Sequence, residues 1–182
     1  EDNKKRVLVI RARDASCDWV MGDDLILEVK GDETMIDVQE ILKSIKGIPV
    51  TRASLWKGTD PPSPISDKHM EWNLNRNGLY DGDMIEVRPS RSNQWLWHPL
   101  EWYEEHILKE VIRITEESRW KGRGCPLSYI TAEVPMPPPL HRQSLRGLLR
   151  KYPERIRLEL DLVSQRFYVQ SNSNKWLLPS SA

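Results

Sequence analysis

The chain has 182 residues, enough for one domain or two small ones. Apolar residues make up 38% and charged residues 30%, a balance typical of a folded globular protein rather than a disordered segment. Every apolar run is shorter than the ~20 residues of a membrane span, so we expect no association with a membrane. The net charge is zero, but residues 1–89 hold 13 Lys and Arg against 17 Asp and Glu, and residues 90–182 hold 14 against 10. This asymmetry predicts two units with different partners, or two halves that attract each other.

The cysteines and histidines give no sign of a metal or catalytic site. Cys17 and Cys125 lack the spacings of a zinc site, and two cysteines are too few for a disulfide framework. The four histidines are scattered, and no glycine-rich loop precedes a Lys-Ser/Thr pair that could hold a phosphate. We therefore expect no enzyme activity, no metal, no cofactor and no small-molecule substrate. The low cysteine content favours a reducing compartment, the cytoplasm or the nucleus.

A strand and a helix are predicted between residues 25 and 47. Apolar and mixed positions alternate through Leu25–Val29, as in a half-buried strand. Thr34 can cap a helix with its hydroxyl, and Asp37 follows at the spacing of a capping box. Gly47 provides a left-handed helix end, and Pro49 prevents the helix from resuming. The helix has one apolar face, formed by Met35, Val38, Ile41, Leu42 and Ile45.

In this order, these segments resemble ubiquitin. The first strand of that family matches Arg6–Arg13, and its Gly-Ile-Pro exit from the helix matches Gly47–Pro49. Its last strand matches Met84–Arg88, which the turn Leu79–Asp83 precedes. The resemblance covers about half of the chain, residues 4–89, and implies a β-grasp fold.

The resemblance also has consequences for function. Conjugated relatives of ubiquitin carry Gly-Gly just beyond the last strand, whereas this sequence contains no Gly-Gly, so we expect no conjugation. Leu55 and Arg88 match part of the surface through which ubiquitin meets its receptors. The resemblance implies a protein-interaction surface at these two residues, more charged than that of ubiquitin. The alternative is a domain that only packs against its neighbour.

Two proline- and tryptophan-rich stretches interrupt the pattern. Residues 59–72 contain three prolines and are predicted to form an irregular loop within the first domain. Residues 90–98 are predicted to link two domains. Trp95 and Trp97, with Trp102 just beyond, favour a linker that is docked rather than flexible.

The second half of the chain is predicted to contain helices followed by a hairpin. Apolar periodicity predicts helices near 100–118, 128–134 and 140–152, then strands at 156–160 and 166–170. This order resembles a winged-helix domain, a helix-turn-helix variant, over residues 99–170. The Leu-Leu-Arg-Lys-Tyr-Pro step before the first strand is similar to that of the RNA-associated LOTUS type. Residues 171–182 form a polar tail.

The predicted helix at 140–152 carries basic residues that suit a recognition helix. Arg142, Arg146 and Arg150 fall on one face, beside the apolar stripe. Further cations follow nearby at Lys151, Arg157 and Arg166. Arginines one turn apart can neutralise successive phosphates or pair with base edges. Carboxylates suit arginine equally well, and the face could instead be solvated or dock an acidic protein.

The sequence therefore predicts an α+β protein, a ubiquitin-like β-grasp domain followed by a winged-helix domain. The predicted function is that of a non-catalytic adaptor, in which the first domain binds a protein and the second binds DNA or RNA. The alternative is a protein–protein scaffold, in which both domains pack together and the arginine face docks an acidic partner.

Overall fold

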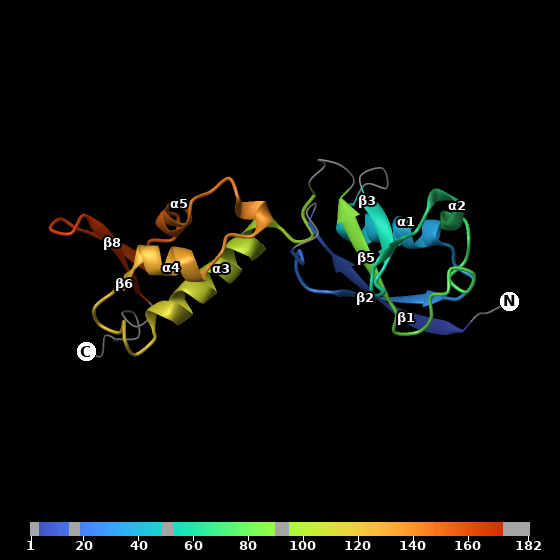
Figure 1. Cartoon of the computed structure of the whole chain (residues 1–182), viewed down its shortest axis with the longest axis horizontal. Coiled ribbons are helices and arrows are strands. Elements are labelled where there is room, and N and C mark those ends of the chain that lie inside the picture. Colours follow the sequence, from blue (N-terminus) through green and yellow to red (C-terminus); the bar gives the residue numbers. More distant parts are fainter. Residues whose placement is uncertain (1–3, 15–18, 49–52, 90–94, 173–182) are drawn as a thin grey trace. The chain divides into compact units, whose positions relative to one another are not determined.

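The chain divides into two compact units, Glu1–His98 and Pro99–Ala182 (Figure 1). The computed structural model describes residues 4–14, 19–48, 53–89 and 95–172. Both units contain helices and strands, so the mixed fold class is confirmed. The predictions for Cys17, Pro49, residues 90–94 and the tail beyond 172 lie outside the described residues.

The first unit is built on a five-stranded sheet. Its strands are β1 (Lys5–Ala12), β2 (Leu25–Lys30), β3 (Ala53–Lys57), β4 (Ser63–Pro64) and β5 (Met84–Pro89). Their order across the sheet is β2-β1-β5-β3-β4. The first and last long strands, β1 and β5, lie side by side and parallel, whereas β1–β2, β3–β5 and β3–β4 are antiparallel. This arrangement confirms the predicted β-grasp fold.

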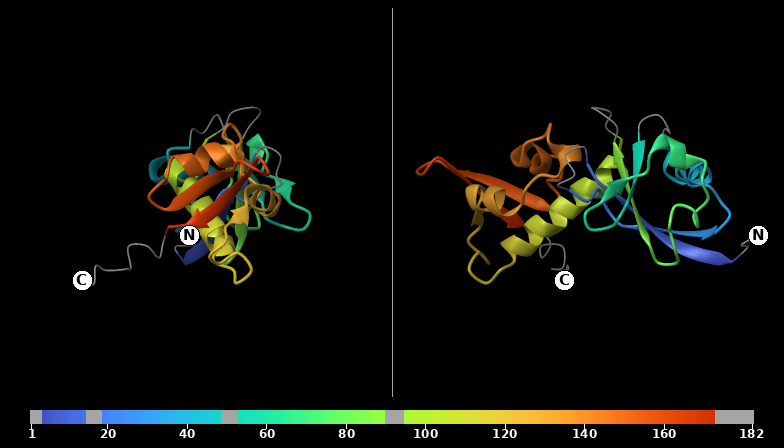
Figure 2. Two further views of the ribbon diagram at one scale, coloured as in Figure 1. Left: turned by 90° about the vertical axis from the view of Figure 1, so that its left-hand side faces the viewer. Right: turned by 45° about the vertical axis from the view of Figure 1, so that its right-hand side comes forward.

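Helix α1 (Met35–Lys46) crosses one face of this sheet (Figure 2). The predicted cap is a complete capping box: the Asp37 amide donates to Thr34 Oγ1 at 3.2 Å, and the Thr34 amide donates to Asp37 Oδ2 at 2.8 Å. The helix ends at Gly47, whose φ of +69° lies in the left-handed region that favours glycine. Ile45 was predicted to face inward, but it is 53% exposed, so the buried face of the helix consists of Met35, Val38 and Leu42.

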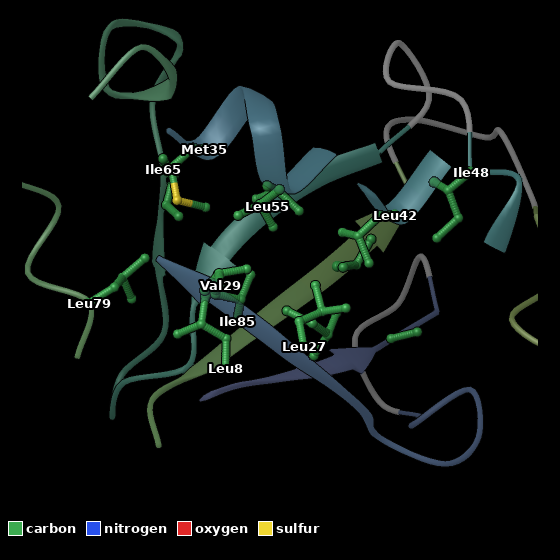
Figure 3. Packing of buried hydrophobic residues seen from close by; sticks show 14 of the residues in the cluster. Leu8, Leu27, Val29, Met35, Leu42, Ile48, Leu55, Ile65, Leu79 and Ile85 are labelled. Atoms are coloured by element: carbon green, nitrogen blue, oxygen red, sulfur yellow. The ribbon is translucent and has the colours of Figure 1, made fainter. Parts of the chain in front are cut away.

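The core of the first unit lies between α1 and the inward-facing side of the sheet (Figure 3). Met35 and Leu42 of the helix pack there with Leu8 and Ile85 of the strands, and each of the four is at most 2% exposed. Burial alternates along β1 and β2, so every second residue of these strands lies on the opposite face. We call that side the outer sheet face.

The loop predicted at residues 59–72 has more structure than expected. It contains β4 and a short helix, α2 (Asp67–Met70). The buried side chain of Asn77 holds this segment, since its amide donates to the carbonyls of His69 (3.0 Å), Trp72 (3.2 Å) and Asn73 (3.2 Å). These bonds provide hydrogen-bond partners for three backbone carbonyls at the end of α2 and just after it.

The described end of the predicted linker packs on the first unit. Trp97 is only 2% exposed within its core, and its Nε1 donates to the Asp23 carbonyl at 2.7 Å. Lys46 Nζ lies 4.5 Å from the centroid of the Trp97 ring. Trp102, in contrast, packs against the core of the second unit.

The second unit combines helices with a small antiparallel sheet. In chain order its elements are α3 (Leu100–Thr115), β6 (Cys125–Pro126), α4 (Leu127–Glu133), the 3₁₀ turn η2 (Pro138–Leu140), α5 (Leu145–Arg150), β7 (Ile156–Asp161) and β8 (Arg166–Ser171). The strand order is β6-β8-β7. The β7–β8 hairpin projects beyond the helices of its own unit (Figure 2). The two-residue β6, which is too short to show a period, was not predicted.

The predicted third helix, 140–152, is wrong in its extent. The chain forms η2 at the prolines, and α5 begins only after Ser144, whose Oγ accepts the Gly147 amide hydrogen at 2.9 Å. Serine is a preferred N-cap, so it starts a new helix rather than continuing one. The predicted inward residues Leu145, Leu148 and Leu149 are buried, at most 6% exposed.

Candidate interaction surfaces

A buried carboxylate lies at the centre of the outer sheet face. Ile85 and Val87 of β5 turn inward, so the intervening Glu86 points to the other side, where it is 4% exposed. Arg13 Nε donates to Glu86 Oε1 at 2.9 Å, and Arg88 Nη2 donates to Glu86 Oε2 at 2.7 Å. Both carboxylate oxygens are therefore bound by a guanidinium, which is the arrangement that offsets the cost of burying the charge.

An aromatic ring fixes one of these arginines. The guanidinium carbon of Arg88 lies 4.0 Å from the centroid of the Trp56 ring, and Trp56 is the cross-strand neighbour of Glu86. The indole Nε1 of Trp56 donates to Ser54 Oγ at 3.1 Å. The side chains of Trp56 and Arg88 are thus held in single orientations before any partner arrives.

The pKa of Glu86 reflects this network. Burial raises the pKa, but the hydrogen bonds from Arg88 and Arg13 outweigh burial and hold it below its ordinary value. Glu86 is therefore ionised at neutral pH, and the group formed by Arg13, Glu86 and Arg88 carries a net charge of +1. We call these three residues and Trp56 the Glu86 network.

The outer sheet face extends from this network across β1 and β2. Arg11 lies next to Glu86 in the parallel register and forms two hydrogen bonds with Asp24, at 3.0 and 2.9 Å. Those bonds lower the pKa of Asp24. Val7 and Ile26 are 37% and 59% exposed, so the face combines paired charges with apolar surface.

Leu55 was predicted to belong to the interaction surface, and the structure corrects this. Leu55 is 2% exposed and points into the core below α1 (Figure 3). Its neighbour Trp56 lies on the outer sheet face together with Ser54. Arg88 does lie on the outer sheet face, and its role in binding stays a prediction.

Sequence reasoning missed Trp56, Glu86 and Arg13. For Glu86, the alternation of residue types along β5 gave a signal in the sequence. Ile85 and Val87 are apolar and face the core, so Glu86 and Arg88 belong to the outer sheet face. The residue of β3 that shares their face must have the same parity, and the register pairs Trp56 with Glu86. Only the pairing register, which the sequence does not contain, selects Trp56 over Leu55.

The predicted arginine stripe of the second unit lies partly on α5 and partly in the turn before it. Arg142 precedes α5, whereas Arg146 and Arg150 lie on it, and all three are exposed. The guanidinium carbon of Arg146 lies 5.1 Å from the centroid of the Phe167 ring on β8. The three side chains therefore do not form one helical stripe.

Two of the predicted nucleic-acid contacts are already bound within the unit. Lys151 Nζ donates to Glu104 Oε2 at 3.0 Å and to Gln143 Oε1 at 2.9 Å. Arg157 forms an ion pair with Glu159. A phosphate would have to compete with these carboxylates, so neither residue offers a ready cationic contact.

Three other predicted residues lack such carboxylates. Over the part of the chain that the structure describes, no ion pair involves Arg142, Arg150 or Arg166, and each of them is exposed. Gly147 is exposed between Arg146 and Arg150 on α5. The absence of a side chain there leaves the backbone open to close approach.

Within the described ranges, no cluster of three His, Cys, Asp or Glu residues could hold a metal ion. Burial raises the pKa of Cys125 to about 11, so its thiol stays protonated at neutral pH. None of the helices in the described ranges is long and apolar enough to cross a membrane.

No protein-family model and no curated protein matches the chain. Solved ubiquitin-like structures match about half of it. The C-terminal ubiquitin-like domain of mouse tubulin-specific chaperone e is similar at 15% identity and a TM-score of 0.38, covering 50% of this chain and 93% of that one. The ubiquitin-like domain of an Arabidopsis thaliana protein is similar at 19% identity and a TM-score of 0.36, covering 50% of this chain and 84% of that one. The ubiquitin of Caldiarchaeum subterraneum is similar at 20% identity and a TM-score of 0.36, covering 48% of this chain and 99% of that one. These similarities carry no function over to this chain, and the β-grasp assignment rests on the strand order and pairing described above.

Proposed function

We propose that the chain is a non-catalytic adaptor module whose first unit binds a protein through the outer sheet face. The observation that carries this proposal is the Glu86 network, in which Trp56 and Arg88 are stacked and held in place on a face that α1 leaves uncovered. Tryptophan and arginine are the side chains that most often dominate interface energies. Because both are fixed beforehand, little side-chain entropy is lost when a partner docks.

The test of this function is a comparison of matched surface variants. Proteins captured by the wild-type chain are compared with those captured by Trp56→Ala and by Arg88→Ala, and the affinity of a purified partner is then measured by calorimetry. Tyr80→Ala is the control, since Tyr80 is 61% exposed and forms no part of the network.

We expect each network variant to weaken the partner about 30-fold, the effect of losing ~2 kcal/mol at a binding hot spot. The control should bind as the wild type does. A partner that binds all of these chains equally would rule out the outer sheet face as its site.

A second candidate function is nucleic-acid binding by the second unit. The order α3-β6-α4-α5-β7-β8, with a projecting hairpin after α5, supports a winged-helix interpretation in which α5 is the recognition helix. Arg142, Arg146 and Arg150, with Arg166 on the hairpin, would contact phosphates, and Gly147 would allow the backbone to approach them closely.

Salt dependence tests this second function. Fluorescence anisotropy with duplex DNA and single-stranded RNA probes is measured at two salt concentrations for the wild type and for the Arg142→Glu/Arg146→Glu/Arg150→Glu variant. Three phosphate contacts predict a log–log slope of about −2 to −3 for the duplex, and the variant should abolish binding. Absence of binding to both probes at low salt would leave the protein–protein scaffold alternative, with an acidic partner on the same arginines.

A further inference from the structure

Helix α4 of the second unit lies between two hollows that share its side chains. One hollow, of about 480 Å³, is lined by Val134, Met136 and Arg146 among others. The other, of about 600 Å³, is lined by Arg166 and Phe167 together with Ser128. Leu127 and Thr131 of α4 line both hollows. We call the two hollows together the α4 groove.

The chemistry of the α4 groove is apolar with a cationic edge. Leucine, valine, methionine and phenylalanine side chains contribute to its walls, whereas its only charged lining residues are Arg146 and Arg166. Neither arginine has an ion-pair partner within the described ranges. Arg146 also stacks on Phe167, so a cation of the first hollow is held against a wall of the second.

We propose that the α4 groove binds a protein segment in which apolar side chains are flanked by Asp or Glu. The apolar walls accept the side chains, and Arg146 and Arg166 pair with the flanking carboxylates. Thr131 is exposed and lines both hollows, so a segment that occupies both of them passes over this residue.

Charge complementarity selects this occupant. The groove offers two arginines and no acidic lining residue, so a basic or neutral segment would leave both guanidinium groups without a carboxylate. The size of the hollows falls in the range of ligand pockets, and concave apolar walls suit leucine or phenylalanine side chains. A nucleic-acid backbone would use the arginines but leave the apolar walls unfilled.

This proposal uses no residue of the outer sheet face, so it and the protein-binding function of the first unit can fail separately. It shares Arg146 and Arg166 with the nucleic-acid candidate. Arg150 separates these two possibilities, because it lies on α5 but lines neither hollow.

The experiment selects ligands from a random-peptide phage library on the full chain and measures the enriched peptides by fluorescence anisotropy. We expect enrichment of sequences with Leu, Ile, Phe or Met between acidic residues. Thr131→Trp, which fills the groove, and Arg146→Glu/Arg166→Glu, which reverses its charge, should each weaken these peptides at least about tenfold.

Two exposed positions provide matched controls. Ala132→Trp places the same ring one residue further along α4, outside the lining of either hollow, and Arg150→Glu reverses a charge outside the groove. Both should bind the peptides as the wild type does, and unchanged melting temperatures establish that every variant is folded.

Three results would overturn the proposal: no enrichment of acidic–apolar sequences, peptides that bind Thr131→Trp as tightly as the wild type, or peptides that Arg150→Glu weakens as strongly as Arg146→Glu/Arg166→Glu. If no peptide is selected, and a duplex or RNA probe binds the wild type but not the Thr131→Trp variant, the groove would be assigned to nucleic acid instead.

Discussion

The arginines at the proposed sites of the two units differ in how they are paired. In the first unit, Arg13 and Arg88 close around a buried carboxylate, and Arg88 is further fixed on Trp56. In the second unit, Arg142 and Arg150 extend from the surface, and no ion pair within the described ranges involves them. The first arrangement makes a rigid surface, whereas the second leaves cations available to a ligand.

This difference shows why net charge is a poor guide to available charge. The first half of the chain has 13 basic against 17 acidic residues, yet the Glu86 network carries a net charge of +1. The second half has an excess of basic residues, but Lys151, Arg155 and Arg157 pair with Glu104, Glu105 and Glu159. The cations that remain available depend on pairings that only the structure contains.

The largest expected effect is a loss of folding stability in the first unit that leaves the second unit unchanged. Leu42→Ala removes a side chain that is 2% exposed in the core of the first unit, and should lower its free energy of unfolding by about 2–5 kcal/mol. Urea unfolding measures this. Ile45→Ala on the same helix, at a residue 53% exposed, should change it by less than about 0.5 kcal/mol. Equal effects from both would mean that the inward face of α1 is wrongly assigned.

The next effect concerns the carboxylate that distinguishes the first unit. Glu86→Gln leaves Arg13 and Arg88 facing each other across a neutral amide, and we expect a loss of about 2 kcal/mol in the free energy of unfolding. Glu110→Gln, which removes an exposed partner of Arg113 on α3, should cost less than about 0.5 kcal/mol. A Glu86→Gln chain as stable as the wild type would show that the network contributes no net stability.

The same carboxylate predicts a dependence on pH. Because the folded-state pKa of Glu86 lies below its unfolded value near 4.5, the stabilisation is fully present above that value and is lost as the pH falls through the folded pKa. Urea unfolding between neutral pH and pH 3 should therefore show a smaller loss of stability for Glu86→Gln than for the wild type. Other carboxylates with lowered pKa values, such as Asp24, are common to both chains and cancel. Parallel curves would contradict the assigned pKa direction.

Local signals predicted the first unit well because its elements are encoded by near neighbours. Thr34 and Asp37 form the capping box, Gly47 takes the left-handed conformation, and the strand order then follows from the β-grasp resemblance. What failed was the choice between two adjacent residues of β3. A shift of one residue moves a side chain to the other face of a sheet. The match to the receptor surface of ubiquitin placed Leu55 among the contacts, although Leu55 is 2% exposed and belongs to the core.

The second unit shows a different limit of sequence reasoning. Helical periodicity correctly identified the buried leucines at 145, 148 and 149, but it extended the helix back across Ser144. Serine and the preceding prolines compete with the helical pattern, and the local cap prevailed. The hollow lined by Arg166 and Phe167 was not predictable, because these residues come to Thr131 from a strand more than thirty residues further along the chain.

The smallest expected effect on stability is the charge reversal of Arg150, and it is compared with the charge reversal of one arginine in the first unit. Arg150 is exposed without an ion pair in the described part of its unit, so Arg150→Glu should leave the free energy of unfolding within about 0.5 kcal/mol of the wild type. Arg88→Glu instead places a second carboxylate against Glu86 and removes the stack on Trp56, and should cost about 2 kcal/mol. Urea unfolding of the two variants beside the wild type measures the contrast. If Arg150→Glu proved as destabilising as Arg88→Glu, the arginines of α5 would be structural, and a ligand for them would no longer be needed to explain their exposure.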